Sequence, residues 1–254
     1  MNDLNSLFDN AQSSGLLGSG SRSLLSGDLG SVVVAGAAGA DLEDIEAAEV
    51  TLVTLLVDES SSIQGYGLTQ AVQEGHGELV KALAGSDEAE GLLLALWTFH
   101  GKRQVVHGYL PVDQAEPLTD ARYRPRGNTT LYDAWCEALA SNVAYAQQLR
   151  DGGAPVRSVV VVITDGEDTG SRRRPGDCKK LSRDLLASEQ FVLAFVGLGQ
   201  DEAGFRRVAK SMGVPDDSVM VQGTTPQAIR SVFRTVSRSA IRASRRRVGG
   251  SSFF

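Results

Sequence analysis

Four segments of the chain are apolar almost without interruption, and this pattern predicts the strands of a buried sheet. They cover residues 51–57 (TLVTLLV), 91–99 (GLLLALWTF), 158–164 (SVVVVIT) and 191–197 (FVLAFVG). Strands that are apolar on both faces are typical of a parallel sheet covered by helices. The segment 103–110 (RQVVHGYL) follows closely and is expected to pair antiparallel at the sheet edge.

Segments with helical periodicity lie between and after the later predicted strands. Apolar residues recur at helical spacing over residues 131–143, 181–186, 205–212 and 229–241. Strands that alternate with helices in this way predict an α/β fold with right-handed crossovers. We therefore expect a doubly wound, mostly parallel, Rossmann-like sheet with one antiparallel edge strand and helices on both faces.

The composition divides the chain into three parts. Residues 1–48 are rich in Gly and Ser, and within them Asp3–Ala11 has the periodicity of a short amphipathic helix. We expect an N-terminal extension that is partly disordered or docks on the main domain. The main domain is expected over residues 49–243. Residues 244–254 are expected to form a C-terminal tail that exposes the final Phe253-Phe254 pair.

Composition and charge then narrow the class of protein. The chain is 42% hydrophobic and 22% charged, which suits a globular protein with a substantial core. A net charge of −6 argues against a protein that coats nucleic acid or an anionic membrane. No run reaches the roughly 18 apolar residues needed to span a bilayer. The N-terminus lacks a basic region followed by an apolar stretch, so we expect a cytoplasmic protein.

The two cysteines add no framework of their own. Cys136 and Cys178 have neither the spacing of a metal site nor the number expected for a disulfide scaffold. Two reduced thiols are therefore expected.

Three short polar motifs carry the candidate chemistry. They are 58–62 (DESSS), 127–130 (GNTT) and 164–166 (TDG), and each adjoins a predicted strand end or helix start. Taken singly, such motifs are ordinary turns or helix caps. Together they supply carboxylate and hydroxyl oxygens, the ligands that a hard cation such as Mg²⁺ prefers. In a doubly wound sheet, ligands bind beyond the carboxyl ends of the strands, where these motifs are expected to converge.

The motif set resembles the metal-ion-dependent adhesion site (MIDAS) of von Willebrand factor A (vWA) domains. The resemblance rests on Asp58-x-Ser60-x-Ser62, on Gly127-Asn128-Thr129 and on residues 161–166 (VVITDG). It implies metal binding by Asp58, Ser60, Ser62, Thr129 and Asp165. It further implies Mg²⁺, or Mn²⁺ or Ca²⁺, bound directly by the hydroxyls and directly or through water by the aspartates. A partner's Asp or Glu would complete the coordination.

The chain departs from the family pattern at two positions. The family commonly has Gly where Ser61 and Asn128 stand, and Ser61 would be strained if its position required a positive φ angle. Thr130, beside Thr129, leaves open which threonine is the ligand. The segment 233–239 (FRTVSRS) also resembles the last helix of intracellular bacterial vWA proteins from tellurite-resistance clusters. That analogy implies an AAA-type ATPase, a kinase or a phosphatase as a partner.

Clusters of arginine suggest two further surfaces. The segments 122–126 and 172–174 are basic, and on an acidic protein they either steer an acidic partner to the metal or are solvated loops. Arginines also recur every fourth residue on the last predicted helix, at positions 230, 234, 238, 242 and 246. This stripe contacts an anionic surface or is a solvated face with extended side chains.

These features favour a non-enzymatic module that binds a divalent cation and captures a carboxylate of a partner protein. No motif of a serine hydrolase, a zinc protease or a P-loop is found in the sequence. One alternative is a Mg²⁺-dependent phosphoester hydrolase that uses Asp58 or Asp165 as base or nucleophile. Another is self-assembly, with the acidic segment 41–46 (DLEDIE) of one copy reaching the metal of another.

Overall fold

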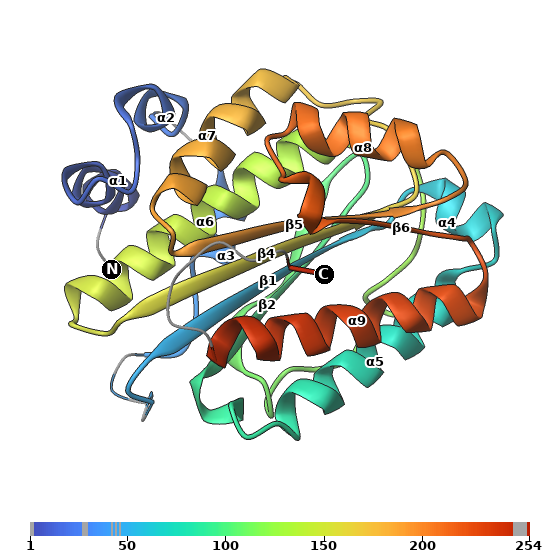
Figure 1. Cartoon of the computed structure of the whole chain (residues 1–254), viewed down its shortest axis with the longest axis horizontal. Helices are drawn as coiled ribbons and strands as arrows, with labels where there is room; N and C mark the ends of the chain where they lie inside the picture. The colour runs from blue at the N-terminus through green and yellow to red at the C-terminus, as the bar shows by residue number, and fades with distance from the viewer. Residues whose placement is uncertain (1–2, 27–29, 42, 44, 46, 246–252) are drawn as a thin grey trace.

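A six-stranded sheet forms the centre of the molecule (Figure 1). The computed structural model describes residues 3–26, 30–41, 43, 45, 47–245 and 253–254. The strand order is β3-β2-β1-β4-β5-β6, and only β3 runs antiparallel to its neighbour. The strands are β1 (Val50–Asp58), β2 (Leu92–Phe99), β3 (Arg103–Pro111), β4 (Val156–Thr164), β5 (Phe191–Leu198) and β6 (Val219–Gln222). The predicted α/β fold class is confirmed, and the antiparallel edge strand lies where it was expected.

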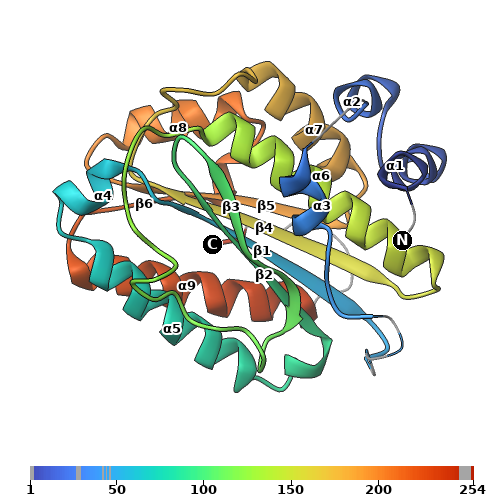
Figure 2. The same cartoon turned by 180° about the vertical axis from the view of Figure 1, so that it is seen from behind.

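Helices cover both faces of this sheet (Figures 1 and 2). One face carries α6 (Leu131–Asp151), α7 (Pro175–Ala187) and α8 (Glu202–Ser211). The other face carries α5 (Thr69–Ala84) and α9 (Pro226–Arg245), which pack side by side. Three short helical turns complete the domain: α4 (Ser61–Gly65), η2 (Ala89–Gly91) and η3 (Asp216–Ser218).

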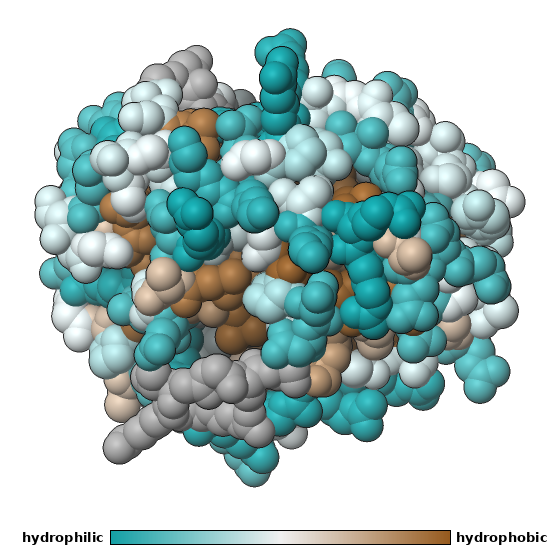
Figure 3. All heavy atoms as spheres, turned by 45° about the horizontal axis from the view of Figure 1, so that its top comes forward, coloured by the Kyte–Doolittle hydropathy of each residue, from teal (hydrophilic) through white to brown (hydrophobic). Residues whose placement is uncertain are grey.

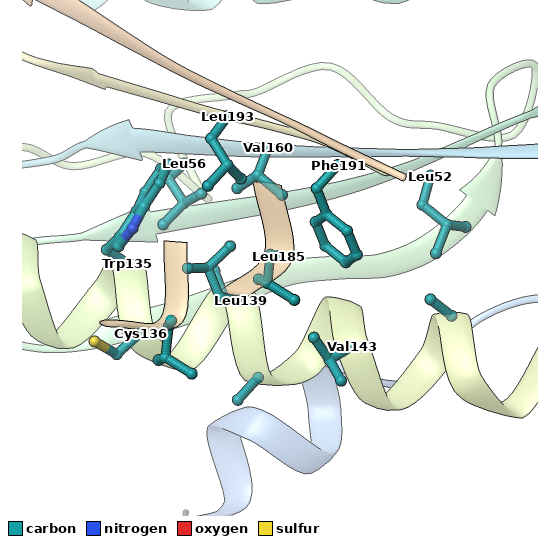
Figure 4. Packing of buried hydrophobic residues seen from close by; sticks show 14 of the residues in the cluster. Leu52, Leu56, Trp135, Cys136, Leu139, Val143, Val160, Leu185, Phe191 and Leu193 are labelled. Atoms are coloured by element: carbon teal, nitrogen blue, oxygen red, sulfur yellow. The ribbon is translucent and has the colours of Figure 1, made fainter. Parts of the chain in front are cut away.

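Alternation along β1 shows how the apolar runs build two cores. Leu52 and Leu56 point to the α6 face, where Leu139 and Val143 meet them (Figure 4). Val53, Leu55 and Val57 belong instead to the core under α5 and α9. Every residue of β1 is buried, as expected for a strand covered on both faces. Each such large apolar side chain contributes about 1.5–3 kcal/mol on burial, so the strand ends are held firmly in place.

The N-terminal segment packs against the α6–α7 face through α1 (Leu4–Ser13), α2 (Ser19–Leu24) and α3 (Ser31–Gly36) (Figure 1). Its apolar residues Phe8, Leu17 and Val33 are buried in the same core as the residues of α6. The predicted amphipathic helix near the N-terminus corresponds to α1. The described apolar residues of this segment are therefore buried against the main domain.

The same segment covers part of the exposed sheet edge. Gly39 forms a β-bridge with Tyr109 of β3, and the backbone of Ala38 and Ala40 hydrogen bonds to Tyr109 at 2.8 and 2.9 Å. Open strand edges favour pairing with other chains, and covering them prevents it. The close approach depends on Gly108, because a β-carbon there would overlap the carbonyl oxygen of Ala38.

The C-terminal pair Phe253-Phe254 was predicted to be exposed, but the structure buries Phe253. Phe253 is 2% exposed, its N–H donates to Ser218 Oγ at 3.3 Å, and its carbonyl accepts from Arg242. The prediction was wrong because this phenylalanine joins the core under α9. Residues 246–252 of the predicted tail, including Arg246 of the arginine stripe, lie outside the described residues, as do positions 42, 44 and 46 of the acidic segment.

Hydrophilic residues cover most of the face seen in Figure 3, with smaller hydrophobic areas between them. Among the described residues, the large hydrophobic side chains with substantial exposure are Val34 and Tyr66. No helix in the described part of the chain has the length and apolar character to cross a membrane.

Candidate metal centre

The polar motifs meet where the strand order reverses. From β1 the chain continues to β2 on one side, whereas β4 pairs with β1 on the other side. Asp58 ends β1 and Asp165 directly follows β4, and Val57, the residue before Asp58, is paired with Ile163, two residues before Asp165. The two aspartates therefore lie at the same sheet edge, at the crevice where doubly wound folds bind ligands.

Asp58 is fully buried, and hydrogen bonds fix both oxygens of its carboxylate. The N–H of Ser60 donates to Oδ1 at 2.8 Å, and Thr164 Oγ1 donates to Oδ2 at 2.5 Å. Burial raises the pKa of Asp58 to about 6, the hydrogen bonds from Thr164 and Ser60 oppose this shift, and the charge of Asp165 adds to it. A cation bound nearby would favour the ionised carboxylate.

Ser60, Ser62 and Asp165 form the open part of the cluster. Ser60 Oγ lies 3.0 Å from Ser62 Oγ and donates to Asp165 Oδ1 at 3.4 Å. The other oxygen, Asp165 Oδ2, is buried and has no hydrogen-bond partner among the described residues. Burial also raises the pKa of Asp165. Buried polar atoms are almost always paired, so this oxygen is suited to accept a bond from a cation or a water molecule.

The two threonines differ in what their hydroxyls already contact. Thr130 Oγ1 donates to the backbone carbonyl of His100. Thr129 Oγ1 lies beside the loop that carries Asp165, 3.7 Å from where a β-carbon on Gly166 would stand. Three hydrogen bonds join this threonine to Thr169: its N–H donates to Thr169 Oγ1 at 3.0 Å, and its carbonyl accepts from Thr169 N at 2.9 Å and from Thr169 Oγ1 at 3.4 Å. The hydroxyl of Thr130 is therefore engaged by a backbone carbonyl, whereas the hydroxyl of Thr129 lies beside the Asp165 loop.

The departures from the family pattern cause no backbone strain. Among the described residues other than glycine, positive φ occurs only at Glu189, so neither Ser61 nor Asn128 needs it. Ser61 begins α4 instead, and its hydroxyl donates to the carbonyl of Gly127 at 3.0 Å. The loop places its left-handed residue at Gly127, with φ at 69°.

A layer of supporting residues was not predicted from the sequence. Tyr123 OH donates to the Asp58 carbonyl at 2.6 Å, and the Arg124 N–H donates to Glu59 Oε1 at 2.5 Å. The Arg126 N–H donates to the Glu59 carbonyl at 2.8 Å. These bonds hold the loop before Thr129 against the loop after β1. Of these residues, only Glu59 drew attention in the sequence, because it lies inside the first motif. The contacts themselves could not be predicted, because they join residues far apart in the sequence.

A family model for the von Willebrand factor type A domain matches residues 53–235. The chain belongs to this family. The match is to the family as a whole and identifies no intracellular bacterial subtype. A comparison with curated protein sequences found no match.

Solved structures share the fold of this vWA domain at low sequence identity. Proximal thread matrix protein 1 from the mussel byssus, in a structure with a zinc-occupied MIDAS motif, is 18% identical with a TM-score of 0.51, over 78% of this chain and 47% of that one. The pilus adhesin SpaC from Lactobacillus rhamnosus GG is 11% identical with a TM-score of 0.59, over 77% and 31%. The PilB minor pilin from Streptococcus sanguinis is 12% identical with a TM-score of 0.57, over 78% and 63%. The chain thus spans less than half of the mussel proteins first matched, at 46% and 47% of their length.

The arginines around the centre of this vWA domain fall into two groups. Arg122 pairs with Glu116, Arg124 Nε donates to the Asp120 carbonyl at 2.8 Å, and Arg173 donates to the Leu24 carbonyl at 3.3 Å. Two others, Arg126 and Arg172, are exposed, and within the described part of the chain their guanidinium groups have no hydrogen-bond or ion-pair partner. These two guanidinium groups are available to a ligand.

The donor set suits a hard cation that is held largely by hydroxyls. Among the described residues, no group of three or more His, Cys, Asp or Glu side chains is placed to hold a metal ion. A centre here would therefore depend on serine and threonine oxygens, two carboxylates and water. Such all-oxygen coordination is typical of Mg²⁺, Mn²⁺ and Ca²⁺ sites.

Proposed function

We propose that this vWA domain is a non-enzymatic protein-interaction module whose partner binds through a divalent cation. Ser60, Ser62 and Thr129 would supply hydroxyl ligands, and Asp58 and Asp165 would act directly or through water. The observation that carries the proposal is the buried and unpartnered Asp165 Oδ2 beside the two serine hydroxyls. Mg²⁺ is the proposed ion, with Mn²⁺ or Ca²⁺ as substitutes.

The geometry also supports a coordination position left for a partner. Both oxygens of Asp58 already accept hydrogen bonds, which favours contact with the ion through water. The hydroxyls and Asp165 then provide fewer oxygens than the octahedral shell of Mg²⁺ needs. Water fills such positions in the free protein, and an aspartate or glutamate of the partner replaces one of them on binding.

Binding is better supported than turnover. A buried Asp58 whose oxygens are both hydrogen bonded is poorly placed to attack a phosphorus centre. His100 lies beside the second loop, but burial lowers its pKa, so it is a weak proton donor at neutral pH. A turnover screen with phosphoesters and nucleotides separates the hypotheses. Sustained hydrolysis that is lost in Asp58→Ala would favour the enzyme.

The surroundings of the centre support an acidic partner segment. Arg126 is exposed on the loop that precedes α6, and Arg172 is exposed on the loop that precedes α7, on a protein of net charge −6. Tyr66 is 58% exposed and lies four residues after Ser62, one turn further along the same stretch. A partner with one carboxylate for the metal, a second for an arginine and an apolar group for Tyr66 matches these features. An AAA-type ATPase, kinase or phosphatase that presents such a segment is the partner class suggested by the bacterial analogy.

A peptide array tests this function directly. Peptides with a central Asp, Glu, Asn or Gln are probed with the full chain in Mg²⁺ or in chelator. We expect binding to Asp and Glu peptides only, lost in chelator and lost in Asp58→Ala. Light scattering of the free chain in the same two buffers detects self-association through the site. An identical set of bound peptides with and without chelator would contradict the proposal.

A further inference from the structure

Two cysteines that are far apart in the sequence meet in the core. Cys136 lies on α6 and Cys178 on α7, and their Sγ atoms are 3.5 Å apart. Both residues are free thiols and both are buried, at 1% and 0% exposure. Figure 4 shows the Cys136 side chain on α6 within the apolar cluster under β1 and β4. Their pairing was not predicted, because the two cysteines are 42 residues apart and meet only through the packing of α6 on α7.

The surrounding contacts hold the first turns of α6 and α7 together. Trp135 Nε1 donates to Ser182 Oγ at 3.0 Å, and the Asp133 carboxylate accepts the N–H groups of Arg172 and Arg173. The Cys178 thiol also donates to the Tyr132 carbonyl at 3.6 Å. An S–S bond of about 2.05 Å requires the sulfurs to approach by about 1.5 Å. The proposed bond therefore needs a closing movement between two sulfurs that already lie in contact.

The pair sits where two loops of the candidate metal centre continue into helices. Leu131, the first residue of α6, comes two positions after Thr129. The loop that begins with Asp165 ends where α7 starts at Pro175. A bond between Cys136 and Cys178 would therefore join the two helices that carry these loops.

We propose that Cys136 and Cys178 are a thiol–disulfide pair, reduced in a reducing compartment and closed into an intramolecular disulfide in an oxidising one. With glutathione disulfide as oxidant, one cysteine thiolate attacks a glutathione sulfur and releases one glutathione thiolate. The second cysteine thiolate then attacks the mixed disulfide and releases the other. The protein loses two electrons and two protons in total, and glutathione disulfide is reduced to two glutathione molecules.

Burial determines when this bond forms. The reactive species is the thiolate, and burial raises the pKa of the Cys178 thiol, with the neighbouring Cys136 adding to the shift. The native fold therefore oxidises slowly. The bond forms efficiently while the chain is folding and its thiols are still accessible to the oxidant.

The test is refolding of the full chain in buffers of reduced or oxidised glutathione, followed by alkylation in denaturant. We expect the oxidised sample to be a monomer lighter by two hydrogen atoms, with neither thiol alkylated and the two cysteine peptides linked in a non-reducing digest. Its Tm should lie about 5–10 °C above that of the reduced protein. Dithiothreitol should reverse both changes.

Cys136→Ser and Cys178→Ser serve as matched controls. Each keeps one thiol, so each should take up glutathione or remain free, without a rise in Tm. Two alkylated thiols in the wild-type chain after oxidative refolding would overturn the proposal. So would disulfides formed only between chains, or an intramolecular disulfide that lowers the Tm.

Discussion

At the residue scale, the candidate metal centre is defined by which oxygen atoms are still free to bind a ligand. Thr164 and Ser60 satisfy the carboxylate of Asp58, and His100 occupies the hydroxyl of Thr130. Unlike both oxygens of Asp58, Asp165 Oδ2 has no hydrogen-bond partner in the described structure. Residues of the same type thus differ in which of their oxygen atoms remain available to a ligand.

The threonine pair provides the first prediction. Thr129→Ala should weaken Mg²⁺ binding at least tenfold, because it removes a hydroxyl that we propose binds the ion. Thr130→Ala should leave the affinity within about threefold and lower the free energy of unfolding by about 1 kcal/mol, since it removes one hydrogen bond. Calorimetric titration with Mg²⁺ and denaturant unfolding measure the two effects. A reversed order of the two affinities would assign the ligand to Thr130.

The motif residues were the most predictable part of the site. Asp58, Ser60, Ser62 and Asp165 could be placed at one sheet edge because each follows a strand with an unmistakable apolar pattern. Tyr123 and Thr164 could not be recognised as supports, because their roles depend on contacts across the sheet. The choice between the threonines was equally out of reach, since adjacent residues at a helix start differ only in the direction of their side chains.

At the element scale, the hydrophobic pattern predicted the long buried strands but missed two elements, β6 and α5. The long buried strands were clear, but β6 has only four residues and partly exposed side chains, so its apolar run was too short to predict a strand. Helix α5 was also missed, because Gly75 and His76 interrupt its buried face. Gly75 is required there, since a β-carbon would overlap the ring of Phe233 on α9. A residue that weakens a sequence pattern can thus be the one that allows two helices to pack.

Contact between the N-terminal segment and β3 provides a prediction at this scale. Gly108→Ala should lower the free energy of unfolding by about 1–3 kcal/mol, because its methyl group would displace the Ala38 carbonyl. Limited proteolysis should then cut near residues 38–40 earlier than in the wild type. Gly101→Ala, in the turn of the same hairpin with open space around it, is the control and should change neither property. Equal protease sensitivity of the two variants would contradict the prediction that the contact between residues 38–40 and β3 depends on Gly108.

Buried His76 on α5 provides a pH prediction. Its Nδ1 accepts the Leu118 N–H at 3.2 Å, and burial lowers its pKa to about 3, with His107 adding to the shift. The unfolded chain protonates this histidine below pH of about 6.5, whereas the folded protein keeps it neutral. The unfolded state therefore binds more protons, and stability is lost as the pH falls from about 6.5 toward 3.

Comparison with His76→Gln isolates this contribution. Between pH 6 and 5, wild type should lose about 1 kcal/mol more per pH unit than the variant, as expected for up to one proton. Asp58 contributes to the pH dependence of stability with the opposite sign, because its pKa is raised in the fold. Its contribution is the same in both proteins and cancels in the comparison. Urea unfolding at several pH values measures the slopes. Parallel slopes would show that His76 does not contribute.

At the scale of the whole molecule, charge is distributed unevenly between the candidate site and the rest of the protein. The chain carries a net charge of −6, yet two unpaired guanidinium groups, Arg126 and Arg172, lie on the loops of the site. An acidic ligand is repelled by the protein as a whole and attracted locally. Such an arrangement affects the rate of association and the orientation of the ligand more than the final affinity.

Neutralising Arg126 or Arg172 tests whether these side chains affect the rate of association. Arg126→Gln and Arg172→Gln should each slow association of an Asp-containing peptide about three- to tenfold at low salt, with the loss shrinking as added salt screens the charges. Lys81→Gln removes the same charge from the last turn of α5, which runs away from the site, and should leave the rate unchanged. Stopped-flow measurements give the rates, and Mg²⁺ titration of each variant should show unaltered metal affinity. Equal slowing by all three variants would mean that only the net charge matters, whereas a loss confined to the site arginines would show that they guide the peptide to the metal.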